Sequence, residues 1–263
     1  MSDVVYVYGF VPAGSAAPEP DLPGIGGAAV ELVGLGRFQG VISRVSAERY
    51  APERIEARLD DLRWVGDHGL AHERVVAWFV DRGDIVPVPL FTFYSGLDAL
   101  REETAGRSAV IAERLARFAG RHQWDIKVGY RADAASAHAA ELSTAVRALE
   151  DDIASAEPGR RYLLERKRAD LVREEVAGAV RSRAHALLEA LQRFAEDVVL
   201  LPLPPADREL PVVLFAALLV AIDAERSFVE EAERLARENE VLGIDLGFSG
   251  PWAPYRFIGD VDD

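Results

Sequence analysis

Two histidines and a neighbouring carboxylate have the residue types and spacing for metal chemistry. His68 and His72 are four residues apart, so on a helix they share one face, with Glu73 beside them. The segment His-Gly-Leu-Ala-His-Glu differs from a zincin motif because its acidic residue is misplaced. Gly69 also weakens a helix at this point. We interpret these side chains as structural or surface groups and expect no metal site.

Glycine clusters and acidic pairs are the other patterns with a bearing on catalysis or cofactor binding. The glycines of 24–27 and 34–36 lack the Gly-Lys-Ser/Thr ending of a phosphate-binding loop. A strand rather than a helix follows them, unlike a dinucleotide fingerprint. Acidic runs at 60–61 and 150–152 are typical of solvated helix ends, and there is no Gly-x-Ser-x-Gly elbow. We therefore expect no catalytic residues, no cofactor and no enzymatic activity.

A basic segment interrupts this acidic chain between Pro158 and Arg168. Its sequence is Pro-Gly-Arg-Arg-Tyr-Leu-Leu-Glu-Arg-Lys-Arg. The Pro-Gly pair predicts a chain break, after which Arg160 and Arg161 open a new helix. Cations at a helix N-terminus oppose its dipole, at a cost of about 0.3–1 kcal/mol each. This cost indicates another role: a salt-bridge face with residues 150–152, or pairing with the carboxylates of a partner.

A second unusual segment, Gly250-Pro251-Trp252-Ala253-Pro254-Tyr255, combines two prolines with two large aromatic residues. Aromatic side chains held on a stiff backbone anchor binding partners well, but they also cover hydrophobic cores. Both interpretations stay open at this stage. The partner-binding residues that we predict from the two segments are Arg160, Arg161, Tyr162, Trp252 and Tyr255.

Composition narrows the class of protein. Of the 263 residues, 49% are hydrophobic and 28% are charged, which is typical of a globular protein with a core. The net charge of -14 argues against nucleic acid and against anionic membrane surfaces as partners. There are no cysteines, so there are no disulfides and no thiolate metal sites. The longest apolar stretch, 210–222, is shorter than the roughly 20 residues of a membrane span. With no basic leader region at the start, we expect a cytoplasmic protein.

The first half of the chain reads as a mixture of strands and helices. Apolar, β-branched runs at 4–10, 29–35 and 41–45 predict strands, and the prolines of 86–90 predict an edge strand. Helices are expected over 52–61, around 70–79 and over 107–119. We assign 1–120 to an N-terminal α+β domain.

The second half is more regular, and we assign 121–263 to a C-terminal domain. Residues 124–130 and 242–248 alternate between apolar and polar, as in strands with one buried face. A long helix is predicted over 160–196, with an apolar stripe from Val172 to Phe194. Further strands at 198–203 and 210–222 and a helix at 224–239 complete the order β-α-β-β-α-β. This is the ferredoxin-like, split βαβ arrangement, and the first half is a variant of it.

Five segments in order along the chain resemble the gas vesicle protein F/L family. They are Tyr-Val-Tyr-Gly at 6–9, Pro-Val-Pro-Leu-Phe at 87–91, Trp-Asp-Ile-Lys-Val at 124–128, Pro-Gly-Arg-Arg-Tyr-Leu at 158–163, and Gly-Pro-Trp-Ala-Pro-Tyr at 250–255. Their order and spacing cover nearly the whole chain. The sequence departs from the family where an arginine is usual within 87–91, and at Ala253, where a proline is common.

The resemblance implies two α+β domains with ferredoxin-like features and a role in gas vesicle formation. Such proteins are implied to be assembly factors or minor components of the vesicle, without enzymatic activity, metal or cofactor. Their implied partners are the small hydrophobic shell protein and other gas vesicle accessory proteins. A shell subunit exposes apolar surface before assembly, and an acidic partner that pairs with it through a sheet edge, such as 242–248, would cover that surface.

Two other classes of function remain as alternatives to an assembly protein. A pair of ferredoxin-like domains that senses a small ligand would hold a polar pocket between its domains. An unrecognised enzyme would hold two titratable groups within hydrogen-bonding distance of each other in a cleft.

Overall fold

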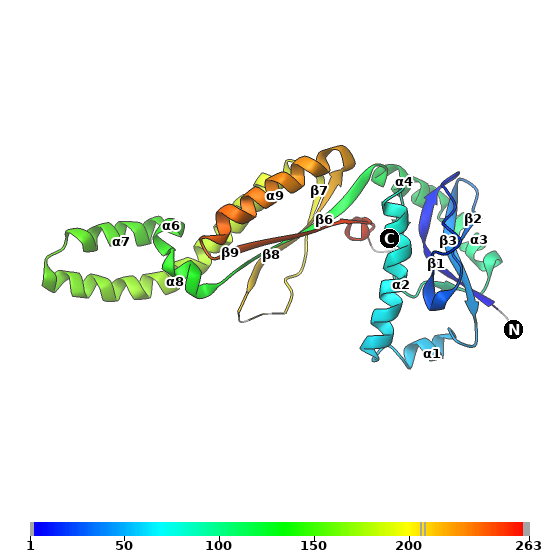
Figure 1. Cartoon of the computed structure of the whole chain (residues 1–263), viewed down its shortest axis with the longest axis horizontal. Helices are drawn as coiled ribbons and strands as arrows, with labels where there is room; N and C mark the ends of the chain where they lie inside the picture. Colours follow the sequence, from blue (N-terminus) through cyan, green and yellow to red (C-terminus); the bar gives the residue numbers. More distant parts are fainter. Residues whose placement is uncertain (1–2, 206, 208, 260–263) are drawn as a thin grey trace. The chain divides into compact units, whose positions relative to one another are not determined.

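The chain combines helices with two antiparallel sheets, and it divides into two compact units (Figure 1). The structure, a computed structural model, describes residues 3–205, 207 and 209–259. The N-terminal unit consists of the residues up to Gln123 together with those from Pro251 onward, and the C-terminal unit is Trp124–Gly250. The expected mixed α+β class is confirmed. Residues 251–259, which we assigned to the second domain, belong instead to the first unit.

A strongly apolar first strand organises the sheet of the N-terminal unit. The strands are β1 (Asp3–Pro12), β2 (Glu31–Gly34), β3 (Phe38–Ser46), β4 (Val86–Pro87) and β5 (Phe93–Tyr94). Their order is β2-β3-β1-β4, and β5 also pairs with β1. Pro87 therefore lies in a strand at the edge of the sheet, as the sequence predicts, whereas Pro89 lies outside the strands.

The helices of the N-terminal unit differ more from expectation than its strands. They are α1 (Pro52–Glu56), α2 (Leu62–Val80), α3 (Leu97–Gly106) and α4 (Ser108–Phe118). Asp61 caps α2 by accepting a hydrogen bond from the Trp64 amide at 3.1 Å. Helix α2, expected around 70–79, buries Val75, Val76 and Phe79, whereas Leu70, expected on the same apolar face, is 68% exposed. Helix α3 was not predicted, because it buries only Leu100 and Thr104.

The C-terminal unit contains the β-α-β-β-α-β order that the alternation of its residues predicts. Its strands are β6 (Arg121–Tyr130), β7 (Ala195–Leu200), β8 (Val212–Ala221) and β9 (Ile244–Trp252), in the sheet order β7-β8-β6-β9. Alternate residues of β8, from Leu214 to Val220, belong to the core of the unit. Residues 216–220 of β8 are all buried, as we expected for a strand within the sheet.

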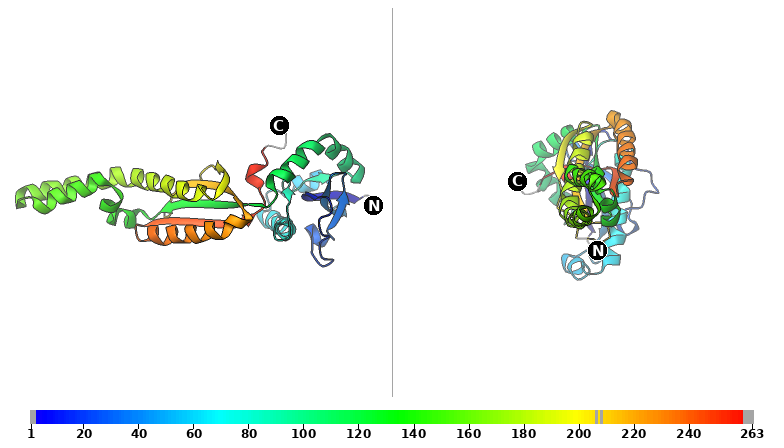
Figure 2. Two further views of the ribbon diagram at one scale, coloured as in Figure 1. Left: turned by 90° about the horizontal axis from the view of Figure 1, so that it is seen from above. Right: turned by 90° about the vertical axis from the view of Figure 1, so that its left-hand side faces the viewer.

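Helices pack against this sheet and extend past it (Figure 2). They are α5 (Ala132–Ala137), α6 (Ala139–Leu142), α7 (Thr144–Ser155), α8 (Pro158–Gln192) and α9 (Glu225–Glu240). The predicted stripe on α8 is confirmed, since Val172, Val176 and Val180 are buried in the core. Helix α8 ends before the predicted residue 196 because β7 begins at Ala195. Among the described residues, no helix has the length and apolar character to cross a membrane.

Candidate functional site: the hairpin tip

Helices α7 and α8 form an antiparallel hairpin whose far end lies beyond the sheet of the C-terminal unit (Figures 1 and 2). Ser143 caps α7, because its hydroxyl accepts a hydrogen bond from the Val146 amide at 3.4 Å. Helix α8 starts with Pro158 at its first position, where a missing N–H costs nothing. The sequence thus breaks the chain at the predicted point, and residues 156–168 form what we call the hairpin tip.

The hairpin tip exposes two large apolar side chains. No residue of α8 between Pro158 and Asp170 is buried. Tyr162 is 66% exposed and Leu163 is 65% exposed. Adjacent exposed apolar residues of this size on a charged helix are typical of an interaction surface.

The cations of the hairpin tip are only partly neutralised within the chain. Arg168 donates a hydrogen bond from Nε to Glu150 Oε1 at 2.6 Å, and Arg161 donates from Nη2 to the Ala156 carbonyl at 3.1 Å. Among the residues that the structure describes, Arg160 has no hydrogen-bond or ion-pair partner. The expected pairing with residues 150–152 therefore involves Arg168 rather than the two arginines of the first turn, which remain available to the carboxylates of a partner.

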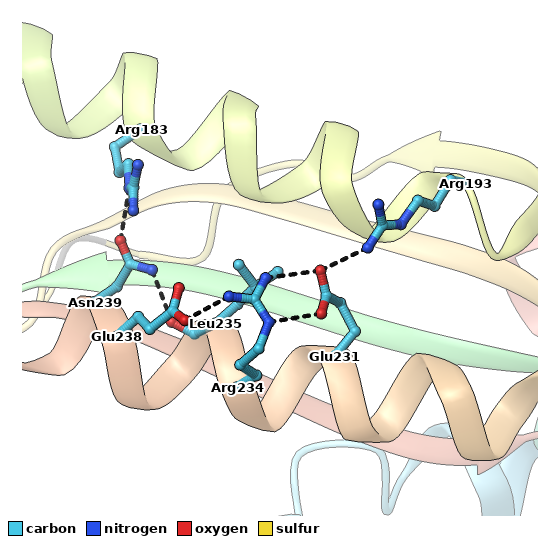
Figure 3. Close-up of polar contacts among 7 residues, drawn as sticks. All are labelled: Arg183, Arg193, Glu231, Arg234, Leu235, Glu238 and Asn239. Atoms are coloured by element: carbon cyan, nitrogen blue, oxygen red, sulfur yellow. Dashed lines mark hydrogen bonds and ion pairs between the residues drawn. The ribbon is translucent and has the colours of Figure 1, made fainter.

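The core-facing half of α8 is fixed to α9 by polar contacts (Figure 3). Arg183 donates from Nε to Oδ1 of the buried Asn239 at 2.7 Å. Arg193 pairs with Glu231 at 2.7 Å. A hydrogen bond from Arg234 also lowers the pKa of the Glu231 carboxyl. These contacts connect the C-terminal half of the long helix and its cap residue to α9, whereas residues 158–170 pack against α7 and have no buried side chain.

The Gly-Pro-Trp-Ala-Pro-Tyr segment covers the core of the N-terminal unit. Ala253 is fully buried there, and Trp252 is 37% exposed. The Tyr255 hydroxyl donates to Glu73 Oε2 at 3.1 Å, and burial raises the pKa of both groups. The core-covering interpretation therefore accounts for Tyr255. The five predicted partner-binding residues belong to different units: the two arginines and Tyr162 to the C-terminal one, Trp252 and Tyr255 to the N-terminal one.

Replacing Tyr255 by phenylalanine is expected to destabilise the N-terminal unit. The partly buried Glu73 carboxylate would lose its hydrogen-bond donor, which costs about 1–3 kcal/mol of unfolding free energy. Urea unfolding followed by tryptophan fluorescence measures the change. Tyr162→Phe is the matched control, because that ring is 66% exposed and its hydroxyl should contribute less than about 0.5 kcal/mol. Equal unfolding midpoints for the two variants would contradict the inward role of Tyr255.

The two histidines lie on α2 in aromatic surroundings. The Tyr50 hydroxyl lies 3.2 Å from His68 Nε2, and His68 Nδ1 lies 2.7 Å from the Trp64 carbonyl oxygen. His72 is 4% exposed, and burial lowers its pKa from 6.5 to about 4. Within the described ranges, no three His, Cys, Asp or Glu side chains are grouped to hold a metal ion.

The Tyr-Val-Tyr-Gly segment has a structural role that the sequence did not reveal. The Tyr8 hydroxyl lies 2.9 Å from the Ser43 hydroxyl and accepts a hydrogen bond from the Ile25 amide at 2.7 Å. The Tyr6 hydroxyl lies 2.6 Å from His72 Nδ1. A Cβ at Gly24 would lie 2.3 Å from the Tyr8 hydroxyl oxygen. Through these two tyrosines, strand β1 is linked to the loop around Gly24 and Ile25 and to helix α2.

This two-unit architecture is found in gas vesicle proteins of known structure. The crystal structure of the gas vesicle protein GvpF from Anabaena sp. PCC7120 matches with a TM-score of 0.68 at 17% identity, over 98% of this chain and 96% of that one. GvpF from Microcystis aeruginosa matches with a TM-score of 0.65 at 17% identity, over 98% and 99%. The fold is thus that of the gas vesicle protein GvpF.

The chain belongs to the gas vesicle synthesis protein GvpL/GvpF family, whose model matches residues 4–259. It is 30% identical to gas vesicle protein L of a Streptomyces species, over 98% of this chain and 94% of the relative. It is 24% identical to gas vesicle protein L2 of Halobacterium salinarum, over 99% and 93%. The resemblance drawn from the five segments is confirmed, and the family gives the protein a role in gas vesicle formation.

Proposed function

We propose that the protein binds the small hydrophobic shell protein of the gas vesicle through its hairpin tip. In doing so it assists the assembly or nucleation of the vesicle wall, as an assembly factor or as a minor component of the wall. The observation that carries this proposal is the pair Tyr162 and Leu163, exposed by 66% and 65% beside the unpaired Arg160. Apolar contact covers the surface of the shell subunit, and the arginines add pairing with its carboxylates.

The edge of the C-terminal sheet is the second surface that we propose for this interaction. Strand β9 lies at one end of the order β7-β8-β6-β9, so one side of its backbone is not paired within the sheet. An extended segment of a partner can add to such an edge. The same strand order, with a helical connection after β6 and α9 after β8, supports a ferredoxin-like assignment for the unit.

Co-expression with the shell protein tests the proposed interface. The double variant Arg160→Ala plus Arg161→Ala is expected to reduce the amount of co-purified shell protein at least about tenfold, because two charge-assisted contacts are lost. The matched control is Arg226→Ala plus Arg237→Ala on α9. Their side chains are 90% and 69% exposed and pair only with neighbouring glutamates of the same helix, so binding should stay unchanged.

Each outcome of the co-purification experiment has a definite meaning. A complex that the hairpin-tip variant weakens and the control does not supports the proposal. A complex that both variants retain places the interface elsewhere, with β9 as the next surface to test. If the unaltered protein forms no complex, binding of the shell protein is wrong, and the role in gas vesicle formation depends on other accessory proteins.

A further inference from the structure

A cavity of about 170 Å³ lies within the N-terminal unit, whereas the hairpin tip belongs to the C-terminal one. It lies between helices α3 and α4 on one side and the segment 86–92 on the other. Its deepest walls are apolar, with Phe10 and Ile111 each 7% exposed and Val86 3% exposed. An apolar cavity of about 150 Å³ is enough to bind benzene, so this one has room for one aromatic ring or one branched aliphatic group.

The charged side chains that line the cavity are two arginines and one glutamate, so its lining carries a net positive charge. Arg107 and Arg114 both line it, and both are partly buried. Among the described residues, Arg107 has one long ion pair of 3.7 Å, to Glu103, whose side chain also lines the cavity. Within the described part of the chain, Arg114 has no hydrogen-bond or ion-pair partner, and the Tyr94 hydroxyl forms no hydrogen bond. In a protein with a net charge of -14, two arginines and a single glutamate beside an apolar cavity favour a carboxylate, with Arg114 as its main partner.

The segment that contributes Pro87, Val88, Pro89 and Thr92 to the cavity has a strained backbone at Phe91, which does not itself line the cavity. Phe91 has a φ of 68°, and it is the one non-glycine residue in the described ranges with a positive φ. Its ring stacks on Trp64 at 5.2 Å. Pro87 and Pro89 stiffen the same segment, and the Thr92 hydroxyl donates to the Pro89 carbonyl at 2.7 Å. A strained segment held in place by stacking and hydrogen bonds is typical of a preformed binding site.

We propose that this cavity binds a small carboxylate carrying a single aromatic or branched aliphatic group. The apolar group fills the space beside Phe10 and Ile111, and the carboxylate accepts hydrogen bonds from Arg114 and Arg107. This binding activity is independent of the proposed interaction with the shell protein, since none of its residues belongs to the hairpin tip. The cavity lies within one unit, unlike the pocket between two domains that a sensor was expected to have.

The probe for the test is 3-phenylpropanoate, with the neutral 3-phenylpropan-1-ol as its uncharged counterpart. Titration of the isotope-labelled full chain, followed by NMR, should show saturable binding of the acid with a Kd on the order of 1 mM or tighter. The affected amides should lie in 86–92 and 103–111. The alcohol should bind at least about tenfold more weakly, because it does not form the charge-assisted hydrogen bonds.

Three variants separate the cavity from general charge effects. Arg114→Gln should weaken binding of the acid at least about tenfold. Val110→Trp, at a position that is 42% exposed and lines the cavity, should abolish it by filling the space. Arg63→Gln removes one positive charge from an exposed position on α2 and should leave binding unchanged. Absence of saturable binding, equal affinity for acid and alcohol, or full affinity in Arg114→Gln would each overturn the proposal.

Discussion

Replacing Gly243 by alanine is expected to lower the unfolding free energy of the C-terminal unit by about 2–5 kcal/mol. Gly243 connects α9 to β9 with a φ of 75°, where a side chain is strained. An added Cβ would lie 2.6 Å from the Ala135 amide nitrogen and 2.7 Å from the Ala134 Cβ. The Gly243 carbonyl also accepts a hydrogen bond from the Arg131 amide at 2.8 Å, so a shift here would disturb the start of α5 as well.

Gly178→Ala is the matched control, because it adds the same methyl group within the same unit. Gly178 lies inside α8, and an added Cβ would meet only the end of the Arg181 side chain, at 3.9 Å. Alanine is the better helix former by about 1 kcal/mol, so this variant should be slightly more stable. Hydrogen exchange of the C-terminal unit during urea unfolding distinguishes the two. Equal stability of Gly243→Ala and the unaltered protein would refute the close approach.

Acidification is expected to destabilise the N-terminal unit through His72. Burial lowers the pKa of His72 from 6.5 to about 4, so between these values the unfolded chain binds its proton more readily than the folded one. The stability is therefore fully present above pH 6.5 and is lost as the pH falls through about 4. A shift of this size corresponds to about 3 kcal/mol of unfolding free energy.

His72→Gln should remove most of this pH dependence while keeping a polar partner for the Tyr6 hydroxyl. The measurement is the unfolding midpoint of the N-terminal unit in urea at pH 7, 5.5 and 4.5. Glu73 acts in the opposite sense, because burial raises its pKa, but it is present in both proteins and cancels in the comparison. His185→Gln, at an exposed position of α8, is the control. If His72→Gln kept the pH dependence of the unaltered protein, titration of His72 would not be its cause.

Residue patterns predict those elements of the fold whose apolar residues recur at a regular spacing. The alternation in 124–130 and 242–248 and the stripe on α8 each imply a buried face, and the structure confirms them. Helices α3, α5 and α6 are short or rich in alanine and polar residues, so their periodicity is too weak to detect. Their position depends on contacts with distant residues, which a local pattern does not contain.

The features of the candidate site also separate into those that a local pattern reveals and those that depend on residues far apart in the chain. The chain break at Pro158 and the excess of arginines after it were visible in the sequence because they are local. For Tyr255 the sequence left an inward and an outward position open, since the choice depends on Glu73, which is 182 residues away in the chain. The cavity in the N-terminal unit was missed for the same reason, because its walls come from β1, from the segment 86–92 and from helices α3 and α4.

Only part of α8 packs against the core of its unit, and this affects the dynamics of the helix. From Val172 onward the helix belongs to the core, whereas residues 158–170 have no buried side chain. The first turns of such a helix can open without exposing core residues, so their amides should exchange at a much lower free energy than those of the core. A partner that docks there must order these turns as it binds. Its affinity is then linked to local helix stability, and substitutions that change helix propensity in this segment alter recognition without touching the contact itself.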